Sequence, residues 1–143
     1  TWLTVGVPIG MLLTNYLRAL PYDFSGYHVV PVPLHKNREW KRGFNQAAII
    51  GASVSRALYL PAIAKNLVRA KETPAQADQK DYGAREKNIA GAFHVERPHE
   101  FKGKNILLVD DVTTSGATLR EAARLLKSAG AKKIIAAVVA RAR

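Results

Sequence analysis

The chain has 143 residues, 48% of them hydrophobic, so it has the size of one domain and enough apolar side chains for a core. It contains no cysteine, which excludes disulfides and thiolate metal sites, and its histidines form no cluster that would replace them. Its 22 basic and 11 acidic residues give a net charge of +11, which indicates anionic partners such as phosphorylated metabolites or nucleic acid.

The beginning of the chain predicts a helix, Leu3–Leu20. Pro8 and Gly10 disfavour a helix interior, so we expect the regular part to begin near Met11. The apolar stretch Val5–Leu13 is too short to cross a bilayer, and no basic segment precedes it as in a signal peptide. We therefore expect a cytoplasmic protein without membrane insertion. Because the sequence opens with threonine inside this helical pattern, we also expect a fragment of a longer protein.

A predicted strand and a basic segment come next. Tyr27–Val32 is apolar and β-branched, and the prolines at its end stop ladder pairing. The following loop, His35–Arg42, carries four positive charges within eight residues. Such donors suit a leaving diphosphate, which gains charge as it separates. The residues expected to meet a diphosphate are His35, Lys36 and Arg42. A solvated loop or a patch for nucleic-acid phosphates is the alternative.

The middle of the chain predicts a helix, two short strands and a long loop. Asn45 is the expected N-cap of the helix, which should stop near Pro61. Leu67–Arg69 and Ala92–Val95 are the expected strands. Residues 70–84 lack apolar periodicity and contain proline and glycine, so they predict a long loop, followed by a short helix up to Ala90. The apolar face of the first helix comprises Ala47, Ile50, Val54 and Leu58.

The segment Ile106–Thr118 has the order of a sugar-phosphate site. The apolar residues Ile106–Val109 predict a strand buried on both faces. Asp110 and Asp111 follow at the carboxyl edge, where open α/β sheets bind their ligands. Alternation along an extended chain would point the two carboxylates to opposite sides, so that only one faces a given ligand.

The small residues after the aspartates lead into a predicted helix that ends before Gly130. Unpaired backbone N–H groups at a helix N-terminus favour a phosphate, and hydroxyl groups add donors. The residues expected to hold the phosphate are Thr113, Thr114, Ser115, Gly116, Ala117 and Thr118. An ordinary capped turn is the alternative, but a cap explains one carboxylate and not two.

Lys132–Ala140 predicts the last strand. Strands alternate with helices along the chain, and the connections are long enough for parallel pairing. The pattern therefore predicts an α/β fold in which helices flank a parallel β-sheet.

Two groups of motifs carry a resemblance to known proteins. Ile106–Thr118 closely resembles the phosphoribosyl pyrophosphate (PRPP) signature of type I phosphoribosyltransferases, with Thr113 where an aliphatic residue is commoner. Val30-Pro-Val-Pro-Leu-His35 and Arg42-Gly-Phe-Asn-Gln46 resemble the ComF family of competence-associated, phosphoribosyltransferase-like proteins. The resemblance covers roughly residues 28–143. Further matching positions are Arg69, Thr73-Pro74, Gln76, Arg85, Asn88, Gly91 and Phe93.

This resemblance implies a type I phosphoribosyltransferase fold for residues 1–143 as a single domain. The family commonly carries an amino-terminal four-cysteine zinc element, and no cysteine is present here, so we expect a fragment that lacks that element. The loop Lys71–Lys87 corresponds by position to the flexible loop that closes over PRPP and excludes water. Its candidate residues are Lys71, Arg85 and Lys87, although acidic neighbours nearly balance their charge and a disordered linker is the alternative.

The function implied is binding of PRPP, or of another phosphoribosyl compound, with Mg²⁺, and phosphoribosyl transfer or release with loss of diphosphate, in DNA uptake. Asp110 and Asp111 would hold the ribose hydroxyls directly or through the hydrated ion. A different class is a non-catalytic competence factor that binds single-stranded DNA or a DNA-uptake partner, and a third is a PRPP-sensing regulator. Dimers are common in this fold family, so a homodimer is a further expectation. The sequence does not indicate the acceptor.

Overall fold

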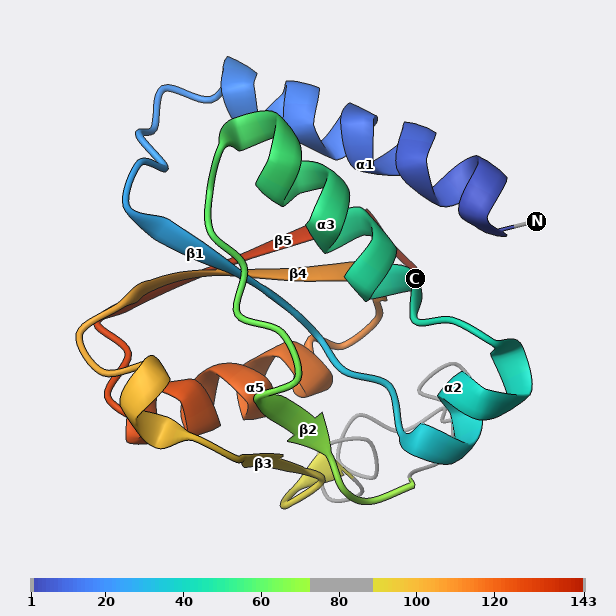
Figure 1. Ribbon diagram of the computed structural model, residues 1–143, viewed down its shortest axis with the longest axis vertical. Coiled ribbons are helices and arrows are strands. Elements are labelled where there is room, and N and C mark those ends of the chain that lie inside the picture. The colour runs from blue at the N-terminus through green and yellow to red at the C-terminus, as the bar shows by residue number, and fades with distance from the viewer. Residues whose placement is uncertain (1, 73–88, 143) are drawn as a thin grey trace.

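The computed structural model describes residues 2–72 and 89–142, in which helices cover both faces of a parallel sheet (Figure 1). The three strands of this sheet lie in the order β1-β4-β5 and are all parallel. Their bounds are β1 Tyr27–Pro31, β4 Asn105–Thr113 and β5 Lys133–Arg141. Helices α1 (Trp2–Ala19) and α3 (Gln46–Leu58) lie on one face, and α5 (Ala117–Ser128) lies on the other. The predicted architecture is confirmed.

Strand β4 forms the centre of both halves of the core. Ile106 and Leu108 belong to the apolar cluster on the α5 side, whereas Leu107 and Val109 pack with α1 and α3. All four side chains are fully buried, as the sequence predicted for a central parallel strand. This burial fixes the position of the strand end, where the two aspartates follow.

Helix α1 begins at Trp2 and passes through Pro8 and Gly10, so the expected start near Met11 is wrong. Packing overrides propensity here: a Cβ atom on Gly10 would lie 2.6 Å from the Cβ of Ser53, so only glycine allows α1 to approach α3 this closely. Pro8 removes one backbone donor near the start of the helix without ending it. Within the described ranges, no helix has the length and apolarity needed to cross a membrane.

The basic segment forms a helix, α2 (Lys36–Arg42), and the prediction of a loop is wrong. The Nδ1 atom of His35 accepts a hydrogen bond from the backbone N–H of Asn37 at 3.2 Å and caps the helix. Gly43, with φ of 79°, ends it in the left-handed conformation. Lysine, arginine and glutamate are good helix formers, so the helix propensity of this segment is not low. The helix was missed because it is short and has no apolar face.

Asn45 caps α3 as predicted and also ties this helix to the end of β1. Its Oδ1 accepts from the N–H of Ala47 at 3.1 Å, and its Nδ2 donates to the carbonyl oxygen of Val32 at 3.2 Å. The helix ends at Leu58, before Pro61. One side chain thus sets the distance between two elements that meet at the carboxyl edge of the sheet.

Replacing Asn45 with alanine should lower the free energy of unfolding by about 1–2 kcal/mol, because a helix cap and a bond to the Val32 carbonyl are lost together. Urea unfolding followed by circular dichroism measures this. Asn45→Asp serves as the control, since it keeps the cap but not the amide donor, and it should lose less. Equal losses in both variants would contradict a capping role.

The two remaining strands form a separate antiparallel pair instead of joining the parallel sheet. They are β2 (Leu67–Arg69) and β3 (Phe93–Val95), with Arg69 opposite Phe93. A short 3₁₀ helix, η2 (Pro98–Glu100), follows β3. The expected long loop lies mostly outside the described residues, as does most of the expected short helix after it. The β2–β3 pair lies near α5 and forms a wall beside the carboxyl edge of the sheet (Figure 1).

Helix α5 ends in the way the sequence predicted. Gly130 has φ of 101° and its N–H donates to the carbonyl of Lys127 at 2.9 Å, while the N–H of Ala131 donates to that of Leu126 at 3.1 Å. This pair of bonds is the Schellman arrangement that glycine favours after a helix. The N-terminus of α5 lies close to the end of strand β4. The first N–H groups of a helix have no carbonyl partner within the helix.

Candidate functional site

A cavity of about 240 Å³ lies where β4 ends and α5 begins. One wall comes from the end of β4 and the first turn of α5, and the other from α2, the start of α3 and β2. Most of the predicted ligand residues lie around it, namely Asp110, Asp111, Thr113, Thr114, Gly116, Ala117, Thr118 and Arg42. Ser115 is buried beside it and accepts a bond from the N–H of Ala117 at 3.3 Å through its Oγ.

The two aspartates line the same cavity, so the prediction that they point to opposite sides is wrong. Each carboxylate accepts the N–H of the next residue: Asp110 Oδ1 from Asp111 at 2.9 Å, and Asp111 Oδ1 from Val112 at 2.8 Å. Each carboxylate thus reaches forward to the residue after it, and the side chain of Asp111 acts directly on Asp110, which simple alternation at the strand end does not predict. A ligand in the cavity therefore meets a pair of carboxyl groups.

The environment of Asp110 favours its protonated form. Burial raises its pKa to about 8, with further contributions from the hydrogen bond and the charge of Asp111. The backbone N–H of Asp111 and the charge of Arg69 act in the opposite direction and are outweighed. At pH 7 Asp110 is thus largely protonated, and a ligand that needs the carboxylate must displace a proton.

The start of α5 offers backbone N–H donors beside the cavity, although that of Ala117 already donates to the Oγ of Ser115. Gly116 is the N-cap residue with φ of 81°, a conformation open to glycine, and its position brings the N–H groups of the first helical turn to the cavity. The Oγ1 atom of Thr114 is buried and has no hydrogen-bond partner among the described residues. A buried hydroxyl without a partner is costly in a folded protein and is typical of a ligand site.

Replacing Thr114 with valine should leave the free energy of unfolding unchanged or raise it by up to about 1 kcal/mol, since the hydroxyl has no described partner to lose. Binding of ribose 5-phosphate should weaken about tenfold, because one donor to the phosphate disappears. Urea unfolding and calorimetry measure the two effects. A loss of stability with unchanged binding would make Thr114 a structural residue.

Two arginines of α2 and the residues at its start line different cavities. Arg38 and Arg42, four residues apart, line the cavity beside the aspartates. His35 and Lys36 line a larger neighbouring cavity. The structure therefore brings Arg42 to the aspartates but not His35 or Lys36, and it adds Arg38, which the sequence analysis left out. A helix-based reading of the basic segment would have selected Arg38 together with Arg42.

Arg69 is the second residue that the sequence analysis left without a role. It lies at the end of β2, is 8% exposed, and its guanidinium lies 5.4 Å from the centre of the Phe93 ring. Burial and the charge of Arg38 lower its pKa, whereas the charge of Asp110 raises it. Arginine stays protonated in proteins, so Arg69 brings a buried positive charge close to the aspartate pair. The feature of the sequence that could have identified Arg69 as a candidate site residue is its position as a charged residue at the end of a short, otherwise apolar strand.

The predicted loop residues contribute little that can be described. Lys71 is exposed and lines neither cavity, while Arg85 and Lys87 lie outside the described residues. Within residues 2–72 and 89–142, no group of three acidic or histidine side chains could hold a metal ion. The hard oxygen donors of Asp110 and Asp111 do fit Mg²⁺, which usually takes one or two carboxylates and completes its shell with water and ligand phosphates.

The chain is similar to phosphoribosyltransferase domains in both sequence and structure. The family model described as phosphoribosyl transferase domain matches residues 44–143. In the solved structure of glutamine PRPP amidotransferase from Bacillus subtilis, the match has a TM-score of 0.60 and 16% identity over 94% of this chain and 26% of that one. For purine phosphoribosyltransferase from Pyrococcus horikoshii the values are 0.54 and 18%, over 94% and 72%. The fold is that of a phosphoribosyltransferase domain.

Curated relatives then define the family. Competence protein F of Haemophilus influenzae is 38% identical over 109 residues, which are 74% of this chain and 46% of the relative. DNA utilization protein YhgH of Escherichia coli is 37% identical, over 74% and 45%, and competence protein ComFC of Bacillus subtilis is 34% identical, over 76% and 42%. The chain belongs to the ComF family of phosphoribosyltransferase-like proteins. It spans less than half the length of these relatives.

Proposed function

We propose that this chain binds PRPP together with Mg²⁺ and promotes loss of diphosphate from it, in a protein that serves DNA uptake. The observation that carries the proposal is the pairing of two unlike walls around one cavity. One wall holds the aspartate pair and the N-terminus of α5, and the other holds Arg38, Arg42 and Arg69. PRPP has the matching sequence of groups: a 5′-phosphate, ribose hydroxyls and a diphosphate.

Each wall has a distinct task in this proposal. The N-terminus of α5 and the hydroxyl of Thr114 hold the 5′-phosphate. Asp110 and Asp111 hold the ribose hydroxyls or the hydrated ion, and their charge favours a cationic centre at the anomeric carbon. Mg²⁺, when bound, neutralises charge on the diphosphate. The arginines meet the diphosphate as it leaves, and their attraction grows as its charge develops.

A diphosphate-release assay tests this function. The protein is incubated with Mg²⁺ and PRPP across a panel of nucleobases and without any base, and released diphosphate is measured. We expect release that depends on Mg²⁺ and is lost in the double variant Asp110→Asn, Asp111→Asn. Calorimetry with PRPP separates binding from turnover: heat without release would identify a PRPP sensor, and no heat at all would end the proposal.

A second candidate function is binding of single-stranded DNA, and Trp40 is the observation that favours it. Its side chain is 86% exposed on α2, between Arg38 and Arg42, where a nucleic-acid base can stack while the cations meet phosphates. The net charge of +11 supports the same reading. A gel-shift series over salt compares the wild type with Trp40→Ala. No binding at ~50 mM salt, where phosphate-contact proteins bind well, would exclude this candidate.

A further inference from the structure

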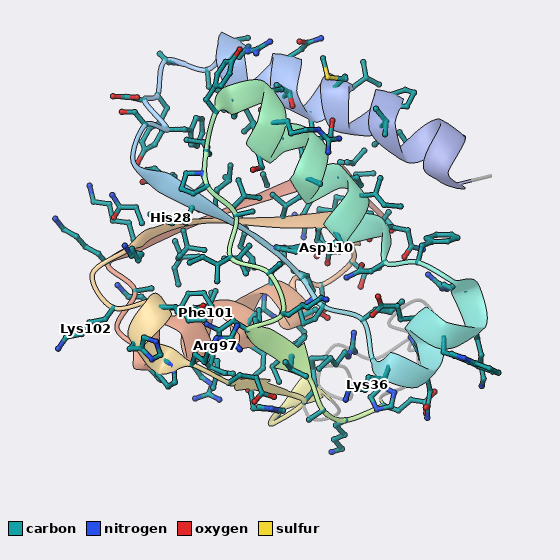
Figure 2. All side chains as sticks on the ribbon, viewed as in Figure 1. His28, Lys36, Arg97, Phe101, Lys102 and Asp110 are labelled. Carbon is teal, nitrogen blue, oxygen red and sulfur yellow. The ribbon has the colours of Figure 1, made fainter. Side chains whose placement is uncertain are left out.

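The larger cavity beside the proposed PRPP site has a volume of about 690 Å³. It lies between α2, the segment before β2 and the β2–β3 pair, and Figure 2 shows Lys36 and Arg97 on either side of β2. Arg69 and Asn45 line both cavities, but Asp110, Asp111 and the start of α5 line only the smaller one. The two cavities are thus neighbours with different chemistry.

The lining of the larger cavity combines an apolar surface with cations. The apolar side chains come from β1, the loop after it, α3, the segment before β2 and β2 itself, and include Val30, Leu34, Ala48, Ile63 and Leu67. The cations are Lys36, Lys65, Arg69 and Arg97, against the carboxylates of Glu39 and Glu96. Arg97 pairs with Glu100 at 2.8 Å, whereas no described carboxylate lies within ion-pair distance of Lys36 or Lys65. Such a lining suits an anion that carries an apolar ring.

Lys65 occupies this wall in a conformation that lysine rarely adopts. Its φ is 57°, in the left-handed region, where glycine or asparagine is usual. Strain of this kind persists only where the surroundings fix the backbone, and it gathers at ligand sites. Lys65 is among the residues that line the cavity, and glycine in its place would supply no positive charge there.

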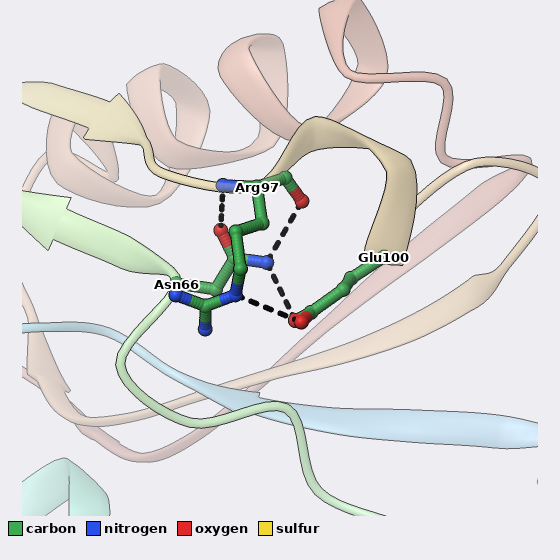
Figure 3. Close-up of polar contacts among 3 residues, drawn as sticks. All are labelled: Asn66, Arg97 and Glu100. Atoms are coloured by element: carbon green, nitrogen blue, oxygen red, sulfur yellow. Dashed lines mark hydrogen bonds and ion pairs between the residues drawn. The ribbon is translucent and has the colours of Figure 1, made fainter.

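The next residue, Asn66, fixes that backbone (Figure 3). Asn66 is fully buried, its Oδ1 accepts from the N–H of Arg97 at 2.8 Å, and its Nδ2 donates to the carbonyl of Arg97 at 2.9 Å and to Glu100 at 2.8 Å. These bonds join the start of β2 to the segment after β3. They hold Lys65 and Arg97 at the same end of the cavity, while Arg69 lies at the other end of β2.

We propose that the larger cavity binds a nucleoside monophosphate as a second ligand. Its volume exceeds the needs of a phosphate or diphosphate ion and suits a nucleotide. The phosphate lies at Lys65, and the base lies against the apolar side chains of Ile63 and Leu67. This ligand is distinct from a nucleotide product in the smaller cavity, whose phosphate would sit at α5. The proposal therefore stands whether or not PRPP is the ligand there.

Calorimetry with adenosine 5′-monophosphate tests the proposal. Ribose 5-phosphate is first added to saturation, so that the cavity at α5 is filled. We expect one further equivalent of the nucleotide to bind, and inorganic phosphate to compete with it only weakly, because the base contacts are missing. If ribose 5-phosphate abolishes all nucleotide binding, the larger cavity is not a separate site and the proposal fails.

Three lysine variants test whether the nucleotide binds in the larger cavity. Lys65→Gly removes the ammonium and tolerates the backbone, so nucleotide binding should weaken about tenfold or more while the melting temperature stays equal or rises. Lys65→Arg should bind within about threefold of the wild type because the charge remains. Lys102→Gly removes the same charge far from the cavity and should change nothing (Figure 2). Wild-type binding by Lys65→Gly, or Lys65-dependent binding of an oligonucleotide but not of the mononucleotide, would overturn the proposal.

Discussion

Replacing Asp110 with asparagine should make the folded protein more stable at and above neutral pH and at the same time weaken PRPP binding by about a hundredfold or more. Burial and the neighbouring Asp111 raise the pKa of Asp110 to about 8, far above its value of about 3.9 in an unfolded chain. Keeping a charge at this position is therefore costly for the fold. Asparagine matches the protonated carboxyl in shape, and its Oδ1 can still accept the N–H of Asp111.

The sign of the pH dependence follows from the raised pKa. The folded state holds a proton that the unfolded state releases, so the contribution of Asp110 is fully present below about pH 4 and is lost as pH rises toward 8. Wild type and Asp110→Asn should thus have similar stability near pH 4. At pH 8.5 the variant should be more stable by ~1–3 kcal/mol. Urea unfolding at several pH values measures the difference.

The binding half of this prediction has its own measurement. PRPP affinity should fall by about a hundredfold or more, because asparagine carries no charge to hold the ion or the cationic centre. In the wild type, calorimetry at pH 7 in buffers of different ionisation enthalpy should detect release of a proton on binding. A variant that loses stability at every pH, or that still binds PRPP, would show that Asp110 serves the fold instead of the ligand.

Sequence patterns predicted the structure correctly where a feature depends on residues that are close together in the sequence. The buried strand Ile106–Val109, the cap by Asn45 and the helix end at Gly130 depend on local hydrogen bonds or on burial of a short apolar run. These features were predicted correctly. Whether the residues around the smaller cavity bind a ligand stays a prediction for the experiments described above.

Sequence patterns failed where contacts between distant elements decide the outcome. Gly10 disfavours a helix in isolation, but α3 packs so closely against it that the helix continues. Arg69 belongs to a three-residue strand, and only the pairing with β3 and the approach of α2 place it beside Asp110. The basic segment lacks an apolar face, so no pattern in the sequence predicted that it is helical. Its helical geometry places Arg42 at the smaller cavity and Lys36 at the larger one.

Replacing Arg69 with methionine should remove most of the affinity for PRPP and little of the affinity for ribose 5-phosphate. Arg69 is buried at the wall opposite the start of α5, where the diphosphate is proposed to lie. Loss of a buried, charge-assisted contact to a group with several negative charges should weaken PRPP binding by about a hundredfold. Ribose 5-phosphate lacks the diphosphate and should lose less than about fivefold.

The same substitution should act on Asp110 through its charge. Arg69 lowers the pKa of Asp110, so its removal should raise that pKa above the wild-type value of about 8. Carbon-detected NMR titration of the aspartate carboxyl groups measures the shift. Methionine keeps the apolar length that packs against Phe93, so the change reports the lost charge more than lost packing.

Two further variants separate charge from geometry at this position. Arg69→Lys keeps the positive charge without the planar guanidinium over Phe93, so it should restore the pKa of Asp110 but only part of the PRPP affinity. Arg97→Met removes a cation that lines only the larger cavity, so PRPP binding should stay within about twofold of the wild type. If Arg69→Met weakened ribose 5-phosphate as strongly as PRPP, Arg69 would support the whole cavity and would not recognise the diphosphate. Unequal losses instead place the diphosphate beside Arg69 and, with it, the reacting carbon between Arg69 and the aspartate pair.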